Sequence, residues 1–267
     1  MTDWSVYALK YAERNNRKRN ESFILDPHHD SPHEMDYFIW ILQSQDRVIM
    51  VDCGYDDAEA KNRGRPILRA PAEALKAINL TAEDITDIVI THLHYDHAGG
   101  IDAFPNAKLY INPIEMAAAT GPCMCVDAFR YPYTADHICS AIKALYSGRL
   151  IFTPDQYQLA DGVMLHQIGG HAKGLQAVQV KTKAGWMCLA SDASHYYENF
   201  MTKKAFPIVI DIEAMYQGYD KILNLASSPA MVIPGHDPLV TTLYPPEGQS
   251  GHAWRLDQGP VKALPTY

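Results

Sequence analysis

The sequence has no run of about 18 apolar residues, the minimum that a membrane-spanning helix requires. Positive charge is also in short supply, because 23 Lys and Arg stand against 31 Asp and Glu, a net charge of −8. Nucleic acids bind basic surfaces, so this balance argues against them as the main partner. The first residues, MTDWSVYALKYAERNN, lack the basic, apolar and small-residue order of a signal peptide. We therefore expect a protein that acts neither on a membrane nor on nucleic acid.

Cysteine is scarce as well, with five residues in 267. An odd number, without a secretory pattern, favours reduced thiols in a cytoplasm. Cys123 and Cys125 are separated by one residue, whereas zinc ribbons and redox motifs use a spacing of two. We interpret the cysteines as small, partly buried side chains and look elsewhere for chemistry.

Short apolar segments of strand length alternate with helical patterns along the chain, without an internal repeat or a clear domain break. The hydrophobic content of 47% and the charged content of 20% are those of an ordinary globular protein. We predict one α/β domain over residues 1–267, with helices covering its sheets and a surface tail at 244–267. The predicted strands are 6–13, 36–43, 47–54, 85–91, 108–112, 148–153, 163–170, 175–182, 185–194 and 230–234. The predicted helices are 70–78, 113–120, 134–148 and 211–228.

The most informative segment is THLHYDHAGG, residues 91–100. It places four groups that bind metals, His92, His94, Asp96 and His97, within six residues. Imidazole and carboxylate are the ligands that zinc and similar divalent ions favour. One tetrahedral metal would not take four ligands from a single loop. The segment therefore predicts two neighbouring metals that share it.

Two metals need further ligands, and the sequence offers three in similar positions. His171, Asp192 and His236 each follow the end of an apolar run. Functional ligands often lie on loops at the ends of rigid strands. We expect these three side chains to complete the site.

Together these residues resemble the HxHxDH motif and downstream ligands of the metallo-β-lactamase superfamily, over about residues 36–240. VDCGYD, residues 51–56, is similar to the strand-end DTG motif of that family, with Cys53 in place of Thr. The resemblance implies a four-layer αββα sandwich with the metals at one rim. It also implies that Asp52 does not bind a metal itself but orients a ligand histidine; a structural carboxylate capping the loop is the alternative.

The resemblance implies two divalent ions, which we take to be Zn2+, and divides the ligands between them. One metal goes to His92, His94 and His171; the other goes to Asp96, His97 and His236; and Asp192 bridges them. Such a pair ionises water and polarises a carbonyl. We therefore expect hydrolysis by a metal-bridging hydroxide, with Asp96 and His195 as the catalytic residues.

The segment SDASHYYENF, residues 191–200, resembles the N-acyl-homoserine lactonase branch of the superfamily. That branch has a Tyr that contacts the lactone carbonyl three residues after the bridging Asp, where this chain has His195. We expect His195 to donate a hydrogen bond to the substrate carbonyl or to protonate the leaving alkoxide; packing beside the site is the alternative. Tyr196 and Met35 are further predicted substrate contacts. The aromatic residues of 121–137 either line an acyl pocket or pack in the core.

The predicted function is the opening of a lactone, with an N-acyl-homoserine lactone as one candidate. The alternative is another acyl substrate on the same metals, such as a thioester, a cyclic amide or a β-lactam. A diiron oxidoreductase of this fold would carry Glu in place of His94, followed by a flavin domain. The partner we expect is a small molecule, and the sequence leaves the oligomeric state open, with a homodimer as one alternative.

Overall fold

A computed structural model describes residues 3–267 of the chain. Its strands form two sheets, one of seven strands in the order β12-β1-β2-β3-β4-β5-β6 and one of five in the order β11-β10-β9-β8-β7. The strands of the first sheet are β1 (Ser5–Arg14), β2 (Met35–Gln43), β3 (Val48–Val51), β4 (Asp87–Val89), β5 (Lys108–Ile111), β6 (Leu150–Phe152) and β12 (Ala253–Arg255). Those of the second are β7 (Gln156–Ala160), β8 (Val163–Gln167), β9 (Gln176–Thr182), β10 (Gly185–Ser191) and β11 (Val232–Pro234).

The helices are mostly short. Those of the first half are α1 (Asp57–Arg63), α2 (Pro71–Ala74), α3 (Tyr95–Ala98) and α4 (Pro113–Ala119). Those of the second half are α5 (Asp127–Arg130), α6 (Ala135–Tyr146), α7 (Tyr197–Thr202), α8 (Ile212–Leu225) and α9 (Val240–Leu243). None of the helices in residues 3–267 combines the length and the apolar character that a membrane crossing requires.

Strand β2 shows how the layers are specified. Side chains alternate between the two faces of a strand, and nearly all of β2 is apolar. Phe38 and Trp40 pack between the sheets, in the same hydrophobic cluster as Val178 of β9. Ile39 and Ile41 lie in the other cluster, which contains residues of the covering helices. A strand buried on both faces reads as a continuous apolar run.

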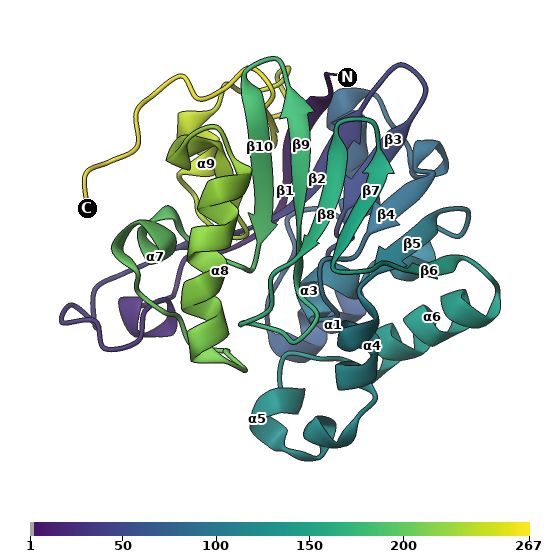
Figure 1. Cartoon of the computed structure of the whole chain (residues 1–267), viewed down its shortest axis with the longest axis horizontal. Coiled ribbons are helices and arrows are strands. Elements are labelled where there is room, and N and C mark those ends of the chain that lie inside the picture. Colours follow the sequence, from purple (N-terminus) through teal and green to yellow (C-terminus); the bar gives the residue numbers. More distant parts are fainter. Residues whose placement is uncertain (1–2) are drawn as a thin grey trace.

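Helices cover the outer faces of both sheets. Figure 1 shows α8 beside β10 of the second sheet. Met215, Tyr219 and Ile222 of α8 are buried in the cluster that the two sheets share. On the other side, Ile138 and Ala141 of α6 pack in the cluster of the first sheet. The order helix, sheet, sheet, helix confirms the predicted αββα architecture.

The site lies where parallel strands end together. β3 and β4 are parallel neighbours in the first sheet, and β10 and β11 are parallel neighbours in the second. Asp52 follows β3, Asp192 follows β10, and His236 comes two residues after β11. In open α/β sheets, ligand sites form outside the carboxyl ends of the strands.

The structure departs from the predicted elements in a few places. The predicted helix 70–78 is α-helical only over Pro71–Ala74 and continues as a 3-10 helix over Leu75–Ile78. The predicted strand 47–54 ends at Val51, because Asp52 and Gly54 adopt positive φ angles of 60° and 67° and turn the chain toward the site. The short helices α1, α3, α5, α7 and α9 and the strand β7 were not predicted. The tail 244–267 also supplies β12, which pairs with β1.

Candidate metal centre

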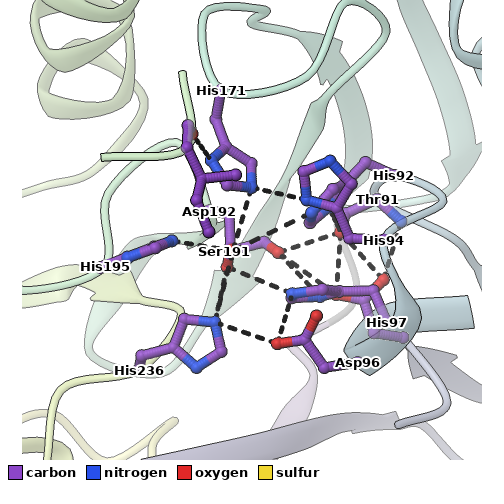
Figure 2. A network of polar contacts seen from close by, with 12 residues as sticks. Thr91, His92, His94, Asp96, His97, His171, Ser191, Asp192, His195 and His236 are labelled. Atoms are coloured by element: carbon purple, nitrogen blue, oxygen red, sulfur yellow. Dashed lines mark hydrogen bonds and ion pairs between the residues drawn. The ribbon is translucent and has the colours of Figure 1, made fainter. Parts of the chain in front are cut away.

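Seven predicted ligands converge from both halves of the chain (Figure 2). His92 and His94 lie in the segment between β4 and α3, and Asp96 and His97 lie on α3. The loops after β8, β10 and β11 bring in His171, Asp192 and His236. All seven side chains are at least nine-tenths buried. The first sheet therefore supplies four candidate ligands and the second sheet three.

Their donor atoms fall into overlapping groups within 4.8 Å. These groups are His92, His94 and His171; His92, His97 and Asp192; Asp96, His97 and His236; and His171, Asp192 and His195. The first and third groups match the two sets of ligands that the sequence predicts, whereas the fourth adds His195.

Asp192 lies between the two groups. Its Oδ1 is 3.3 Å from His97 Nε2 and 3.1 Å from His236 Nε2. Its Oδ2 is 3.3 Å from His171 Nε2. His236 Nε2 also lies 3.3 Å from Oδ2, so the carboxylate lies between the two groups, with Oδ1 toward His97 and Oδ2 toward His171, as a bridging ligand would.

Several of these atoms have no hydrogen-bond partner in residues 3–267. His92 Nε2, His97 Nε2 and Asp192 Oδ1 are all buried and unsatisfied. Buried polar atoms are normally paired, so three unpaired atoms on residues whose ligand atoms lie within 4.8 Å of one another call for a missing group. His94 Nδ1 lies 2.9 Å from His171 Nε2, while two nitrogens on one tetrahedral zinc stand roughly 3.3 Å apart. The residues therefore fit two divalent metals.

Asp52 fixes the orientation of His97. Its Oδ2 accepts a hydrogen bond from His97 Nδ1 at 2.8 Å, which leaves Nε2 facing the cluster. The same carboxylate accepts from the backbone N–H of Thr91 at 2.8 Å and from its hydroxyl. Thr91 Oγ1 also lies 2.9 Å from Ser191 Oγ of the second sheet. Asp52 thus holds both a candidate ligand, His97, and the loop that carries it. The two roles predicted for Asp52, orienting a histidine and capping the loop, therefore occur together.

Two other histidines are held by backbone carbonyls. His171 Nδ1 donates to the carbonyl of Ile208 at 2.6 Å, and His236 Nδ1 donates to that of Asp36 at 2.9 Å. Such partners fix the tautomer and leave Nε2 free to bind a metal.

The protonation states fit metal binding. Burial lowers the pKa of His92 and His94 well below the usual value, and that of His171 to about 3. These three imidazoles are neutral at pH 7, the state that ligates a metal. Burial opposes a charge on His97 as well, yet the carboxylates around it, led by Asp192, raise its pKa. The same carboxylates would favour a divalent cation there.

His195 lies in the wall of the metal cavity. Its Nε2 is 3.0 Å from Asp192 Oδ2, and its ring stacks on Phe206 with centroids 3.8 Å apart. Its Nδ1 is buried without a partner in the described part of the chain. Burial lowers its pKa to about 4, although Asp192 opposes the shift. The structure brings His195 to the site, and its role stays a prediction.

The two other predicted substrate contacts lie in different places. Met35 contributes to the wall of the metal cavity, which encloses about 60 Å³. Tyr196 instead lines a neighbouring cavity, and its hydroxyl donates to the carbonyl of Glu34. It also accepts a hydrogen bond from Arg17, which does line the metal cavity. The position of Tyr196 therefore suits holding Arg17 better than direct contact with a substrate.

The aromatic segment 121–137 encloses a second, larger cavity of about 620 Å³, lined in part by Met124, Tyr131 and Tyr133. Tyr133 separates this cavity from the metal site, since its ring is 4.6 Å from that of His94. The segment therefore lines a cavity and also packs in the core, through Tyr133, and its use as an acyl pocket stays a prediction.

Sequence reasoning missed Glu115, which is fully buried on α4. Its carboxylate accepts hydrogen bonds from the backbone of Leu93 at 3.0 Å and of Gly174 at 2.9 Å, and from the hydroxyl of Tyr133. It therefore joins the loop of His92 and His94 to the loop of His171. The one signal in the sequence is that Glu115 is the single charged residue of the otherwise apolar segment PIEMAAA.

Comparison with known proteins places this geometry in a family. The profile of the Metallo-beta-lactamase superfamily matches residues 35–236. The N-acyl homoserine lactonase of Bacillus cereus is 27% identical over 203 residues, which cover 70% of this chain and 72% of that protein. The N-acyl homoserine lactonase AiiB of Agrobacterium fabrum is 29% identical over 187 residues, covering 60% and 64%.

Solved structures share the fold. An N-acyl homoserine lactone hydrolase with N-hexanoyl-L-homoserine bound at its catalytic metal centre has a TM-score of 0.73 at 21% identity, covering 90% of this chain and 95% of that one. The hydrolase AbOPH of the beta lactamase superfamily has a TM-score of 0.75 at 19% identity, covering 98% and 96%. The profile match, together with the buried cluster of His and Asp donors, identifies the chain as a metal-dependent hydrolase belonging to the metallo-beta-lactamase superfamily and distantly related to N-acyl homoserine lactonases.

Proposed function

We propose that this chain opens lactones, with a small cyclic ester as substrate and two zinc ions as cofactors. The observation that carries the proposal is Asp192, whose carboxylate lies between the two groups of histidines beside a cavity. The relatives named N-acyl homoserine lactonase favour a lactone over other acyl compounds. N-acyl homoserine lactones are therefore the first candidates.

Two bound metals supply an ionised water and polarise the scissile carbonyl. The chain itself orients the histidines that would bind these metals. Hydrogen bonds to Asp52 and to the carbonyls of Ile208 and Asp36 fix three of their imidazole rings. Rigid support of this kind preserves the geometry that the reaction needs.

His195 supplies a hydrogen-bond donor in this proposal. With a pKa of about 4 its imidazole is neutral at pH 7 and carries a single N–H. Without metal this N–H is on Nε2 and donates to Asp192 Oδ2, and a metal bound by that carboxylate would free it for a substrate oxygen. Cations nearby would lower that pKa further, so His195 does not hold a proton to give to the leaving alkoxide. Of the two predicted roles, donation to a substrate oxygen fits its burial better. Met35 and Ile208 contribute to the cavity wall and would limit the access of bulk water.

The test is a pH-stat hydrolysis panel of lactones, thioesters, β-lactams and cyclic amides, on protein whose metal content has been measured. We expect lactones to be hydrolysed with a kcat/KM at least about tenfold above the other classes, a 1.4 kcal/mol preference. Hydrolysis of thioesters alone would contradict the proposal and favour the alternative acyl substrate.

A matched pair of variants serves as control. Asp192→Asn removes the carboxylate that faces both groups, and we expect it to abolish turnover of every substrate. His28→Ala removes an exposed histidine from a loop outside the cavity wall and should leave turnover unchanged. Equal turnover by the two variants would show that the hydrolysis does not come from this centre.

A further inference from the structure

Three arginines contribute to the wall of the metal cavity: Arg14, Arg17 and Arg65. Arg14 ends β1, Arg17 lies in the loop after it, and Arg65 comes two residues after α1. The chain as a whole is acidic, with a net charge of −8. A gathering of cations at this cavity therefore does not follow from the average composition.

The first two arginines share one carboxylate. Arg14 Nη2 is 3.3 Å from Glu21 Oε2, and Arg17 Nε is 3.6 Å from the same oxygen. Arg17 is further held by the hydroxyls of Ser22 and Tyr196. Arg14 and Arg17 thus share one acid, and the other two acids of the cavity wall, Asp96 and Asp192, are candidate metal ligands.

Arg65 has neutral partners. Its guanidinium donates to the hydroxyl of Tyr95, and Nη2 donates to the hydroxyl of Tyr131 at 3.3 Å. It lies over the ring of Tyr95, 5.1 Å from the centroid. Within residues 3–267 no carboxylate lies within 4.0 Å of it, although Asp96 lines the same cavity. Asp96 faces His97 and His236 and belongs to the candidate metal ligands.

We propose that the substrate carries a carboxylate in addition to its scissile ester, and that Arg65 binds this carboxylate. This inference rests on the proposed lactone hydrolysis. A half-buried cation with no carboxylate in direct contact is costly, and a bound anion would offset that cost. The planar guanidinium is suited to binding a carboxylate through two parallel hydrogen bonds, and Arg14 on the same wall adds attraction. Arg65 is then a specificity-determining residue, because neutral lactones of equal size lack the group that it binds.

The experiment compares two γ-butyrolactones that differ only in a ring substituent, a carboxylate in one and the neutral carboxamide in the other. In the parent protein we expect the carboxylate to raise kcat/KM about tenfold to a hundredfold, mainly through KM. Arg65→Gln should remove that preference and leave the carboxamide within about twofold, whereas Arg65→Lys should retain part of it. Lys61→Gln removes one exposed charge from α1 and serves as the matched control with the preference intact.

A binding measurement separates this inference from the proposed function. Calorimetric titration of the metal-free protein with the carboxylate lactone should give an affinity about tenfold weaker in Arg65→Gln than in Lys61→Gln. If neither lactone is hydrolysed, the proposed function fails, and this titration alone decides the inference. If Arg65→Gln weakens both lactones equally, Arg65 only supports Tyr95 and the inference is overturned. Equal turnover and binding of the two lactones by the parent protein would also overturn it.

Discussion

At the scale of single residues, His195 is where this chain departs most clearly from the lactonase pattern. It stands where the resemblance to the lactonases predicts a tyrosine, lies in the cavity wall and contacts Asp192 through Nε2. Stacking on Phe206 and burial restrict its ring to one orientation. A restricted donor beside a developing negative charge contributes more than a mobile one.

His195→Ala should lower kcat for the lactone by about tenfold to a thousandfold, the range for loss of one such donor. His195→Tyr restores a hydroxyl donor and should recover part of that loss. Steady-state kinetics on samples matched for metal content measure both effects. Unchanged turnover in His195→Ala would leave the residue with a packing role.

Asp26 is the residue whose charge most clearly supports the loop beside the site. Its carboxylate lies 2.6 Å from Arg19 and 3.4 Å from Lys204, and both cations also contact Glu198 of α7. The Arg19 guanidinium, which donates to it, holds the pKa of Asp26 well below its usual value despite its burial. The ionised carboxylate of Asp26 therefore stabilises the fold at every pH above the pKa that Asp has in the unfolded chain, about 4. This contribution is lost progressively as the pH falls below that value.

Asp26→Asn should lower the free energy of unfolding by about 1–3 kcal/mol at neutral pH. The difference from the parent should narrow toward about pH 3, where the unfolded chain binds the proton and offsets the benefit. Urea unfolding at both pH values measures this difference in the free energy of unfolding. Metal-free protein is used so that the release of metal in acid does not interfere. Asp127→Asn breaks an exposed pair with Arg130 and should change stability by less than about 1 kcal/mol. A pH-independent difference for Asp26→Asn would contradict this account.

At the scale of elements, the turn after α3 depends on close backbone contact. Gly99 and Gly100 have φ angles of −75° and −96°, which any residue can adopt. Space is the constraint, because a Cβ on Gly100 would lie 2.2 Å from the carbonyl oxygen of Cys53. Cys53 is the neighbour of Asp52, so this contact helps to align α3 with the residue that orients His97.

Gly100→Ala should therefore cost about 1–3 kcal/mol or more and weaken metal binding, since α3 or the 52–54 segment must shift. Gly148→Ala is a suitable comparison, because its Cβ would meet nothing within 4 Å and only its positive φ of 77° opposes the change. Thermal unfolding and metal titration of both variants measure the two effects. Equal metal affinity in the two variants would exclude a role for the turn in aligning the site.

At the scale of the whole molecule, the candidate metal centre joins the two sheets. Four ligands follow elements of the seven-stranded sheet and three follow strands of the five-stranded sheet. Metals that bind only the folded chain stabilise it by mass action.

Removal of metal by a chelator should abolish hydrolysis and lower the melting temperature. A free-metal concentration about a thousandfold above Kd corresponds to roughly 4 kcal/mol of stabilisation. Calorimetry before and after chelation, with elemental analysis, should show two metals per chain and recovery when zinc is returned. A single metal per chain, or an unchanged melting temperature, would refute the paired site.

The sequence by itself determined the ligand types, their order and a domain of sheets covered by helices, while the four layers came from the family resemblance. The elements follow from local patterns, because the apolar run of β2 and the helical spacing on α6 and α8 each report one element at a time. The cluster at 92–97 was evident for the same reason, since its members are neighbours along the chain.

The tertiary structure alone decided what depends on contacts between distant segments. It placed Asp192 between the two groups of histidines, and buried Glu115 between two ligand loops. It also paired the tail with β1 and brought Arg14 and Arg65, 51 positions apart in the sequence, to one cavity. No local pattern encodes such pairs, because burial and charge balance are properties of the packed chain. The sequence therefore predicts the catalytic metals, whereas the folded cavity decides which substrates reach them.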